Sequence, residues 1–432
     1  MKSLRARSMW MGSFSLSLAL VIAACTSGSE EAGETQAGEV SSCRSLDSTL
    51  EWYGDNRQEL DQFIARAGEC GGGGDVAEGA PLALFDWDNT VVKNDISYAT
   101  VYWMIKNDKV LQPPDRDWTA TSRYMTAEAA SALATACGGE VEPGQPLPTG
   151  TDLDCADEIL AVLEGETAAG EPAFASYDHR RNNPSYAWFV QIMGGHSVQD
   201  LTDFTRAARA ENLAATEGAE QTVGTHQVDA SVRYYPQMVD LIDTLRANGF
   251  DVRIISASAE PVVRVWAEEL GFEPDRVMGV RPVIDNGIIT RHLVGCGDVP
   301  DGEDAMVPTV DGKRCQVNQV VFGVTGADAF APLPAEERQV FAAGDTGTDV
   351  TFLGDATGLR LVINRNNPEL MCKAYDNSDG KWLINPMFLQ PKAQMPQPYP
   401  CSSTAFVEAD GTSGPVHRAD GSVIEDQVDS IY

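Results

Sequence analysis

Residues 81–90 read PLALFDWDNT. A short apolar run at residues 81–85 leads directly into Asp86, and Asp88 follows two positions later. Such a run is typical of a buried strand in a parallel sheet. Ligands of open α/β sheets bind at the carboxyl ends of their strands. We therefore predict that the two carboxylates meet a small substrate at the end of this strand.

A strand and helix alternation continues after residue 235. Short apolar runs with strand character are separated by stretches of helical spacing, of which Met238, Leu241, Ile242 and Leu245 are one example. The runs lie at residues 252–255, 340–343 and 361–363, and residues 277–289 predict two strands around a turn. Alternating strands and helices predict an α/β fold with a doubly wound parallel sheet.

Helical patterns alone fill the stretch between the first and second strands, which predicts an inserted helical cap. Residues 46–67 also have the spacing of an amphipathic helix. The predicted organisation is a lipoprotein signal peptide at 1–24, a flexible acidic tether at 25–42, an N-terminal helical segment at 43–80, a catalytic core at 81–97 and 231–376, the cap at 98–230, and a C-terminal extension at 377–432.

Three further segments carry polar residues suited to binding a phosphoryl group. The second strand ends at Ser256, Lys313 lies at the start of a predicted helix, and the third strand leads into Asp345 and Asp349. A hydroxyl group, a cation and a helix N-terminus all favour a bound anion. A nucleophilic carboxylate beside a phosphate also requires a metal and a cation to cancel the repulsion.

These four segments, in this order, resemble the motifs of the haloacid dehalogenase superfamily. The matching residues are DWDNT at 86–90, a strand ending in Ser256, Lys313, and GDTGTD at 344–349. The helical insertion resembles the cap of the subgroup that contains phosphoserine phosphatase. The phrases ISASAEPVVR and AAGDTGTD are similar to those of exported phosphorylcholine phosphatase-like lipoproteins.

The resemblance implies a role for each matching residue. Asp86 is the nucleophile and Asp88 the general acid and base. Thr90, Ser256 and Lys313 hold the phosphate, with Arg314 left open as an alternative to Lys313. Mg²⁺ is the implied cofactor, because its ligands are oxygen atoms. The implied metal-site residues are Asp86, Asp88, Asp345 and Asp349.

The cap supplies candidates for contact with the rest of the substrate. Trp87, Asp95, Tyr98 and Tyr102 are the candidates, because aromatic rings beside an acid suit a quaternary ammonium group. Packing in the core is the alternative for the aromatic residues. Asp95 is the only carboxylate close after the first motif where the choline-cleaving relatives carry several, so we do not expect choline specificity.

The first 25 residues predict export and a lipid anchor. Lys2, Arg5 and Arg7 precede an apolar stretch that is too short for a membrane span and is typical of a signal peptide. The stretch ends in Ile-Ala-Ala-Cys, which resembles a bacterial lipobox with Cys25 as the lipidated residue. Thr26 after the cysteine favours the outer membrane. We expect an exported lipoprotein that faces the periplasm or lies at the cell surface.

The eight remaining cysteines form neighbouring pairs along the chain. An even number of cysteines in an exported protein predicts disulfide bonds. The neighbours are Cys43 and Cys70, Cys137 and Cys155, Cys296 and Cys315, and Cys372 and Cys401. Other pairings stay open at this point, because sequence alone does not fix connectivity.

The formal net charge of −33 restricts the partners. Such a field repels nucleic acid and anionic lipid, so we expect no nucleic acid and no membrane contact beyond the anchor. No protein partner is indicated. The sequence thus predicts an exported Mg²⁺-dependent phosphomonoesterase that acts on a small organic phosphomonoester through an aspartyl-phosphate. The alternatives are a non-catalytic binding lipoprotein with the same fold and a phosphotransferase.

Overall fold

A computed structural model describes residues 43–70 and 76–432. The predicted signal peptide, the lipidation site at Cys25 and the predicted tether lie outside the described residues. Within the described part of the chain, no helix has both the length and the apolar character needed to cross a membrane.

Six parallel strands form the central sheet, in the order β12-β11-β10-β1-β6-β7. This arrangement confirms the predicted doubly wound α/β fold, because β1 lies inside the sheet and the chain adds strands on both sides of it. The strands are β1 (Leu82–Phe85), β6 (Asp251–Ala259), β7 (Val277–Val280), β10 (Phe341–Gly344), β11 (Leu359–Asn364) and β12 (Trp382–Pro386).

Helices cover both faces of the sheet, and the alternation of side chains along β1 shows why. Ala83 and Phe85 point into one hydrophobic cluster, whereas Leu82 and Leu84 point into another. A strand that is buried on both faces is therefore apolar throughout. The first cluster includes α1 (Asn56–Ala67), α7 (Pro236–Ala247) and α8 (Glu260–Ala267), and the second includes α9 (Asp311–Phe322), α10 (Val350–Asp355) and α11 (Pro368–Asp376).

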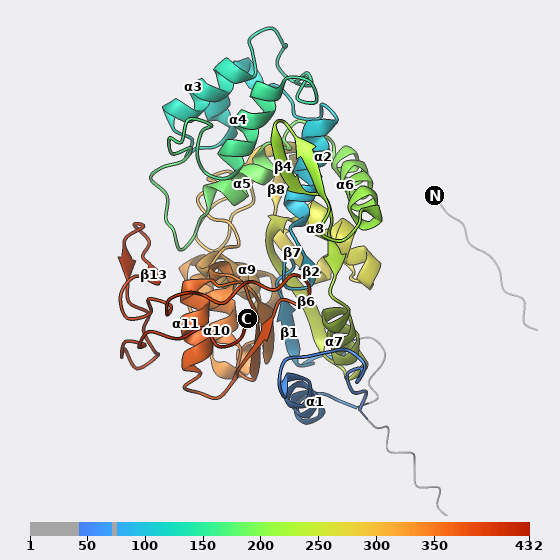
Figure 1. Cartoon of the computed structure of the whole chain (residues 1–432), viewed down its shortest axis with the longest axis vertical. Coiled ribbons are helices and arrows are strands. Elements are labelled where there is room, and N and C mark those ends of the chain that lie inside the picture. The colour runs from blue at the N-terminus through green and yellow to red at the C-terminus, as the bar shows by residue number, and fades with distance from the viewer. Residues whose placement is uncertain (1–42, 71–75) are drawn as a thin grey trace, which may run out of the picture. The chain divides into compact units, whose positions relative to one another are not determined.

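The inserted cap lies above the sheet in the view of Figure 1. Its five helices are α2 (Ile96–Lys106), α3 (Ala127–Ala136), α4 (Leu153–Leu163), α5 (Pro184–Gln191) and α6 (Val198–Ala214), followed by the hairpin of β3 (Glu220–Val223) and β4 (His226–Asp229). The chain enters the cap beside β2 (Val92–Lys93) and returns along β5 (Arg233–Tyr234). These two short strands pair antiparallel and form a neck.

Further attachments fasten the cap to the core, one of them between α6 and α8, where Arg209 pairs with Glu269, just after α8, at 2.8 Å. The hairpin of β8 (Pro282–Asp285) and β9 (Ile288–Leu293) bonds to the loop after α5, where the Gly195 amide donates to the carbonyl of Ile289 at 2.8 Å. The loop before α5 reaches the C-terminal extension, where the His179 amide donates to the carbonyl of Ala409 at 2.9 Å. Beside it, Arg180 pairs with Glu369 at 2.9 Å and lies over the ring of Phe406.

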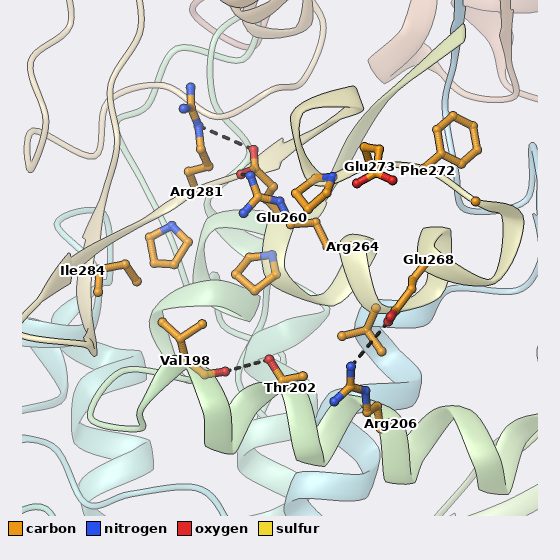
Figure 2. Close-up of a pocket in the computed structure, with 15 residues that line it drawn as sticks. Val198, Thr202, Arg206, Glu260, Arg264, Glu268, Phe272, Glu273, Arg281 and Ile284 are labelled. Atoms are coloured by element: carbon orange, nitrogen blue, oxygen red, sulfur yellow. Dashed lines mark hydrogen bonds and ion pairs between the residues drawn. The ribbon is translucent and has the colours of Figure 1, made fainter. Parts of the chain in front are cut away.

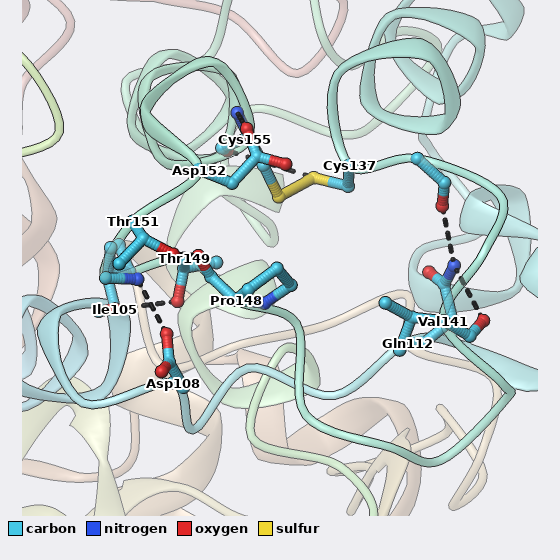
Figure 3. The surroundings of a disulfide bond; sticks show 12 residues. Ile105, Asp108, Gln112, Cys137, Val141, Pro148, Thr149, Thr151, Asp152 and Cys155 are labelled. Atoms are coloured by element: carbon cyan, nitrogen blue, oxygen red, sulfur yellow. Dashed lines mark hydrogen bonds between the residues drawn. A yellow bond between two sulfur atoms is a disulfide. The ribbon is translucent and has the colours of Figure 1, made fainter.

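All four neighbouring cysteine pairs form disulfide bonds, which confirms the pairing suggested by their order along the chain. Cys137 and Cys155 join α3 to α4 inside the cap. Figure 3 shows this bond beside the loop that carries Thr149, whose hydroxyl donates to the carbonyl of Ile105 at 2.6 Å. The closed loops span between 18 and 29 residues, so each bond constrains one local segment of the unfolded chain.

Two predicted boundaries were wrong. The helix predicted at 46–67 begins only at Asn56, because the amide and hydroxyl of Thr49 bond to the carboxylate of Asp47 and Gly54 adopts a φ of 51°. The core does not end at residue 376 either. The strand β12 pairs with β11 and completes the sheet, and the C-terminal extension packs Tyr399 and Val416 into the second cluster. The extension also carries the short pair β13 (Phe406–Val407) and β14 (Ser413–Gly414).

Candidate active site

Three adjacent strands bring the predicted catalytic residues together. Phe85 at the end of β1 is paired with Ala343 of β10 on one side and with Ile254 of β6 on the other. Because the strands are parallel and in register, the residues that follow them meet at one edge of the sheet. Asp86 and Asp345 lie there directly after β1 and β10.

A buried lysine links two of the carboxylates. The Nζ atom of Lys313 lies 2.6 Å from Asp86 Oδ1 and 2.6 Å from Asp349 Oδ1. Burial lowers the pKa of Lys313, but the charges of Asp349 and Asp86 outweigh this effect and raise it overall, so the ammonium stays charged. Arg314 points elsewhere and pairs with Asp355 at 2.6 Å. The cation at this site is Lys313.

The backbone holds Asp349 in place. Its Oδ2 atom accepts hydrogen bonds from the amides of Asp345 at 2.9 Å and Thr346 at 3.0 Å. Gly344 is required here, because a Cβ atom at that position would lie 2.7 Å from the Asp349 carboxylate. Asp349 is thus a fixed part of the loop after β10.

Asp345 accepts from one residue of the first motif and from one arginine. The hydroxyl of Thr90 donates to Asp345 Oδ1 at 3.0 Å and lies 3.3 Å from Asp86 Oδ2. Arg365 Nη1 lies 2.7 Å from Asp345 Oδ2. Burial raises the pKa of Asp345, and the Arg365 charge opposes that rise.

Asp88 has a different environment from Asp86. Its Oδ1 accepts from the amide of Ile96 at 2.8 Å, and its Oδ2 accepts from the hydroxyl of Ser258 at 2.6 Å. Burial raises the pKa of Asp88 well above its ordinary value, and the charge of Asp95 raises it further. Burial followed by the charge of Asp349 also raises the pKa of Asp86, but there the Lys313 ammonium opposes the rise. The protonated carboxyl is therefore favoured most clearly at Asp88, which has no cation bonded to it among the described residues.

Ser256 is placed less directly than the sequence predicts. Its side chain is buried, and its Oγ accepts from the amide of Ser258 at 3.1 Å. Asp86, Asp88 and Asp345 line a small cavity, which we call the catalytic cavity, and the residues of this strand that line it are Ala257 and Ser258. Ser256 therefore orients the end of β6 beneath the site.

The catalytic cavity is small. It has a volume of about 40 Å³, enough for only a few atoms, and it contains Asp86, Asp88 and Asp345. A second cavity of about 720 Å³, which we call the chamber, adjoins it. Asp95, Tyr186 and Arg365 line both.

The candidate cap residues divide between the chamber and the core. Asp95, Tyr98 and Tyr102 line the chamber, and Asp95 also caps α2 by accepting from the amides of Ser97 and Tyr98. Trp87 does not line it, so this expectation was wrong. Its ring is fully buried against Tyr234 and Phe272, because the chain at this point directs Trp87 away from the face that carries Asp86 and Asp88.

Sequence reasoning missed three residues at this site: Ser258, Arg365 and Tyr186. Ser258 lies near the end of β6, two residues after Ser256, so its position at the strand end is the signal that could have found it. Arg365 directly follows β11, so the strand-end rule applied to that strand would have found it. Tyr186 belongs to α5, and no local pattern connects it with a strand end 100 residues earlier.

A third hollow lies away from this chemistry. It has a volume of about 710 Å³ and is formed by residues of α6, α8 and β8. Figure 2 shows Glu260 on its wall, paired with Arg264 at 2.7 Å and Arg281 at 3.5 Å. None of the predicted site residues line it. Its size alone therefore does not make it the catalytic cavity.

Comparison with known proteins supports the assignment of the fold. Residues 170–354 match the family model of haloacid dehalogenase-like hydrolases, a range that includes Ser256, Lys313, Asp345 and Asp349. No curated protein sequence matches the chain.

Three solved structures illustrate the similarity. A conserved protein of unknown function from Anaerococcus prevotii DSM 20548 is 18% identical with a TM-score of 0.56, and the alignment covers 78% of this chain and 93% of that one. A protein of unknown function from Bordetella pertussis Tohama I is 16% identical, with coverages of 70% and 96% and a TM-score of 0.41. A substrate-bound phosphoserine phosphatase is 12% identical, with coverages of 66% and 86% and a TM-score of 0.30. The first of these structures shares the fold of this chain.

Proposed function

We propose that the chain belongs to the haloacid dehalogenase-like hydrolases, whose family model matches residues 170–354, and that it is a Mg²⁺-dependent phosphomonoesterase that works through an aspartyl-phosphate. One observation carries the proposal. Asp86 lies directly after β1 against the buried Lys313, whereas Asp88, two residues later, has no cation bonded to it among the described residues and accepts hydrogen bonds from Ser258 and the Ile96 amide instead. Two carboxyl groups with environments this different suit a nucleophile and a general acid.

The residues present fit a divalent cation. Asp86, Asp345 and Asp349 offer carboxylate oxygens that all lie within 4.8 Å of one another, and oxygen ligands suit Mg²⁺. Charge supports the same conclusion. Asp86, Asp88, Asp95, Asp345 and Asp349 share the site with two cations, Lys313 and Arg365, so negative charge is in excess. When bound, Mg²⁺ would offset this charge and polarise a phosphoryl oxygen.

The proposed first step transfers the phosphoryl group to Asp86. A carboxylate oxygen of Asp86 forms a bond to phosphorus, and the bond from phosphorus to the alcohol oxygen breaks. Asp88 gives its proton to that oxygen, so a neutral alcohol leaves. Lys313 favours the ionised form of Asp86 against the effect of burial and stabilises the negative charge on the phosphoryl oxygens.

The second step releases phosphate and restores the enzyme. Asp88, now ionised, removes a proton from water as the water oxygen attacks phosphorus. The bond between phosphorus and Asp86 breaks, and inorganic phosphate forms. Ser258 donates to Asp88 and orients it for both steps.

We further propose that the protein is an exported lipoprotein attached through Cys25 at the outer membrane. The support is the basic and apolar sequence of the first 25 residues. The four disulfide bonds fit an oxidising compartment.

Hydrolysis of p-nitrophenyl phosphate by the purified full-length protein tests the proposed reaction. We expect release of nitrophenol that requires Mg²⁺, stops with EDTA and is lost in Asp86→Asn. Asp243→Asn, which removes the same charge from the exposed side of α7, is the matched control and should retain activity. A phosphoryl group transferred from labelled substrate and removed by hydroxylamine would identify the acyl phosphate. Full activity in Asp86→Asn would refute the proposed nucleophile.

A further inference from the structure

The chamber is the space available for the rest of the substrate. The catalytic cavity holds only a few atoms, so the alcohol part of a phosphate ester must extend beyond it. Asp95, Tyr186 and Arg365 line both spaces and mark the passage between them. A leaving group bonded to a phosphoryl group at Asp86 therefore enters the chamber.

Two lysines in the chamber have no partner in the part of the chain that the structure describes. Lys93 is half-buried on β2, and Lys392 is exposed in the segment after β12. Neither forms an ion pair or a side-chain hydrogen bond with any residue of 43–70 or 76–432. Burial lowers the pKa of Lys93, the positive charges of Lys392 and Arg365 lower it further, and the charges of Asp229 and Glu217 only partly oppose this. Three cations thus share one wall in a protein whose formal net charge is −33.

The acidic residues of the chamber are largely engaged. Glu164 accepts from the hydroxyl of Tyr98 at 2.6 Å, and Asp95 accepts from two amides at the start of α2. Asp229 on β4 is exposed, as Lys392 is, and it also has no ion pair among the described residues. Two lysines of the chamber, Lys93 and Lys392, therefore stand against one unpaired carboxylate, so positive charge is in excess among its unpaired groups.

We propose that the chamber selects phosphomonoesters whose alcohol carries an anionic group, either a carboxylate or a second phosphate, held by Lys93 and Lys392. The inference rests on the proposed function, because the chamber is read as the leaving-group site of that reaction. It favours an anionic leaving group over the quaternary ammonium group considered from the sequence.

Binding to Asp86→Asn, measured by calorimetry with Mg²⁺ present, separates recognition from turnover. The probes are four esters of similar size: 2-phosphoglycolate with a carboxylate, ethylene glycol bisphosphate with a phosphate, ethyl phosphate with no charge on its alcohol part, and phosphoethanolamine with an ammonium. We expect the two anionic esters to bind at least about fivefold more tightly than ethyl phosphate, and phosphoethanolamine most weakly. The order of the two anionic esters identifies the preferred group.

Lysine variants in the Asp86→Asn background test the assignment to residues. Lys93→Met and Lys392→Met should each reduce the preference for anionic esters by about threefold to fivefold. Lys109→Met is the matched control, because this half-buried cap lysine carries the same charge but does not line the chamber. It should leave the preference unchanged.

The outcomes distinguish the two proposals. Equal binding of all four esters, tighter binding of phosphoethanolamine, or an equal loss in Lys109→Met would overturn the inference about the chamber. If the expected preference appears but the wild-type protein hydrolyses none of the esters, the chamber is an anion-binding site and the proposed reaction is wrong. If the wild-type protein hydrolyses p-nitrophenyl phosphate but shows no preference for anionic esters, the proposed reaction stands and the inference about the chamber is wrong.

Discussion

The catalytic cavity and the chamber adjoin each other but are built differently. In the cavity, the charged groups are buried and paired across strand ends, as Lys313 is with Asp86 and Asp349. In the chamber, Lys93 and Lys392 lie on loops and a short edge strand and have no partner within the described residues. The sheet therefore fixes the position of the chemistry. The chamber walls come from segments that can change without disturbing the sheet, which makes them suited to selecting the substrate.

Of the changes considered, replacement of Lys313 in the catalytic cavity is expected to have the largest effect on activity and stability. Lys313→Met removes the cation from two buried carboxylates, so activity should fall by roughly 10²- to 10³-fold. The free energy of unfolding without Mg²⁺ should fall by roughly 3 to 5 kcal/mol, because buried charges lose their partner. Steady-state kinetics and urea unfolding measure the two effects.

Arg314→Met is the control for this change, since Arg314 is adjacent in sequence and bonds to Asp355 outside the cavity. It should retain most of the activity. If Arg314→Met were inactive and Lys313→Met active, the assignment of the cation would be reversed.

Arg365 lies between the catalytic cavity and the chamber, so its replacement tests whether these two spaces act together. Arg365→Met should raise KM by about tenfold, because a cation that faces the substrate is lost. It should also lower the Mg²⁺ concentration needed for activity, because Asp345 loses its competing partner. Arg365→Lys should lie between the two, since it keeps the charge but not the fork-shaped donor. An unchanged KM would confine Arg365 to a structural role.

Ser258→Ala should shift the pH dependence without abolishing activity. The Ser258 hydrogen bond lowers the pKa of Asp88, so removing it should raise that pKa. The first step needs protonated Asp88, and kcat/KM should therefore begin its alkaline decline at a higher pH in the variant. The pH profile of kcat/KM measures this shift. Ser97→Ala is the control, because the Ser97 hydroxyl also lies near the cavity but has no hydrogen-bond partner among the described residues. A decline at lower pH in Ser258→Ala would contradict the assignment.

Ionic strength should have the smallest effect. The negative field of the whole protein repels an anionic substrate, and salt screens that repulsion. Between about 10 and 150 mM salt we expect kcat/KM for p-nitrophenyl phosphate to rise about twofold. The rise should be smaller for 2-phosphoglycolate, because salt also screens the lysines of the chamber. A steady fall for p-nitrophenyl phosphate would show that local cations dominate the approach.

Local sequence patterns predicted the strands and helices that build the catalytic edge. The apolar runs before Asp86 and Asp345 are short and distinct, and a parallel sheet brings their ends together whatever lies between them. The strand β12 was missed because its sequence, WLINP, contains an asparagine and a proline and begins a Pro-rich segment. Only its pairing with β11 shows that it belongs to the sheet.

The chamber was far less predictable. Lys93, Tyr186 and Lys392 lie far apart in the sequence and meet through the packing of the cap and the C-terminal extension. For Trp87 the sequence suggested a shared site that the structure does not form. Its neighbours in sequence are catalytic candidates, yet its side chain points into the core. Nearness along the chain indicates a shared site only when the side chains lie on the same face.

The cap is attached to the core at several places: the neck, the hairpin β8–β9, the packing of α6 against α8, and the contact between Arg180 and the C-terminal extension. A cap attached at a single point can rotate as a rigid body about that point. A cap attached at several separate points cannot rotate in this way. We therefore expect substrate to reach the catalytic residues through rotations of individual side chains. Arg365 and Tyr186, which line both spaces, would control this passage. Hydrogen exchange at residues 178–181 measures this directly. Protection of these amides that persists during turnover would support a cap that stays in place. Loss of protection when substrate is added would show that the cap opens as a rigid body.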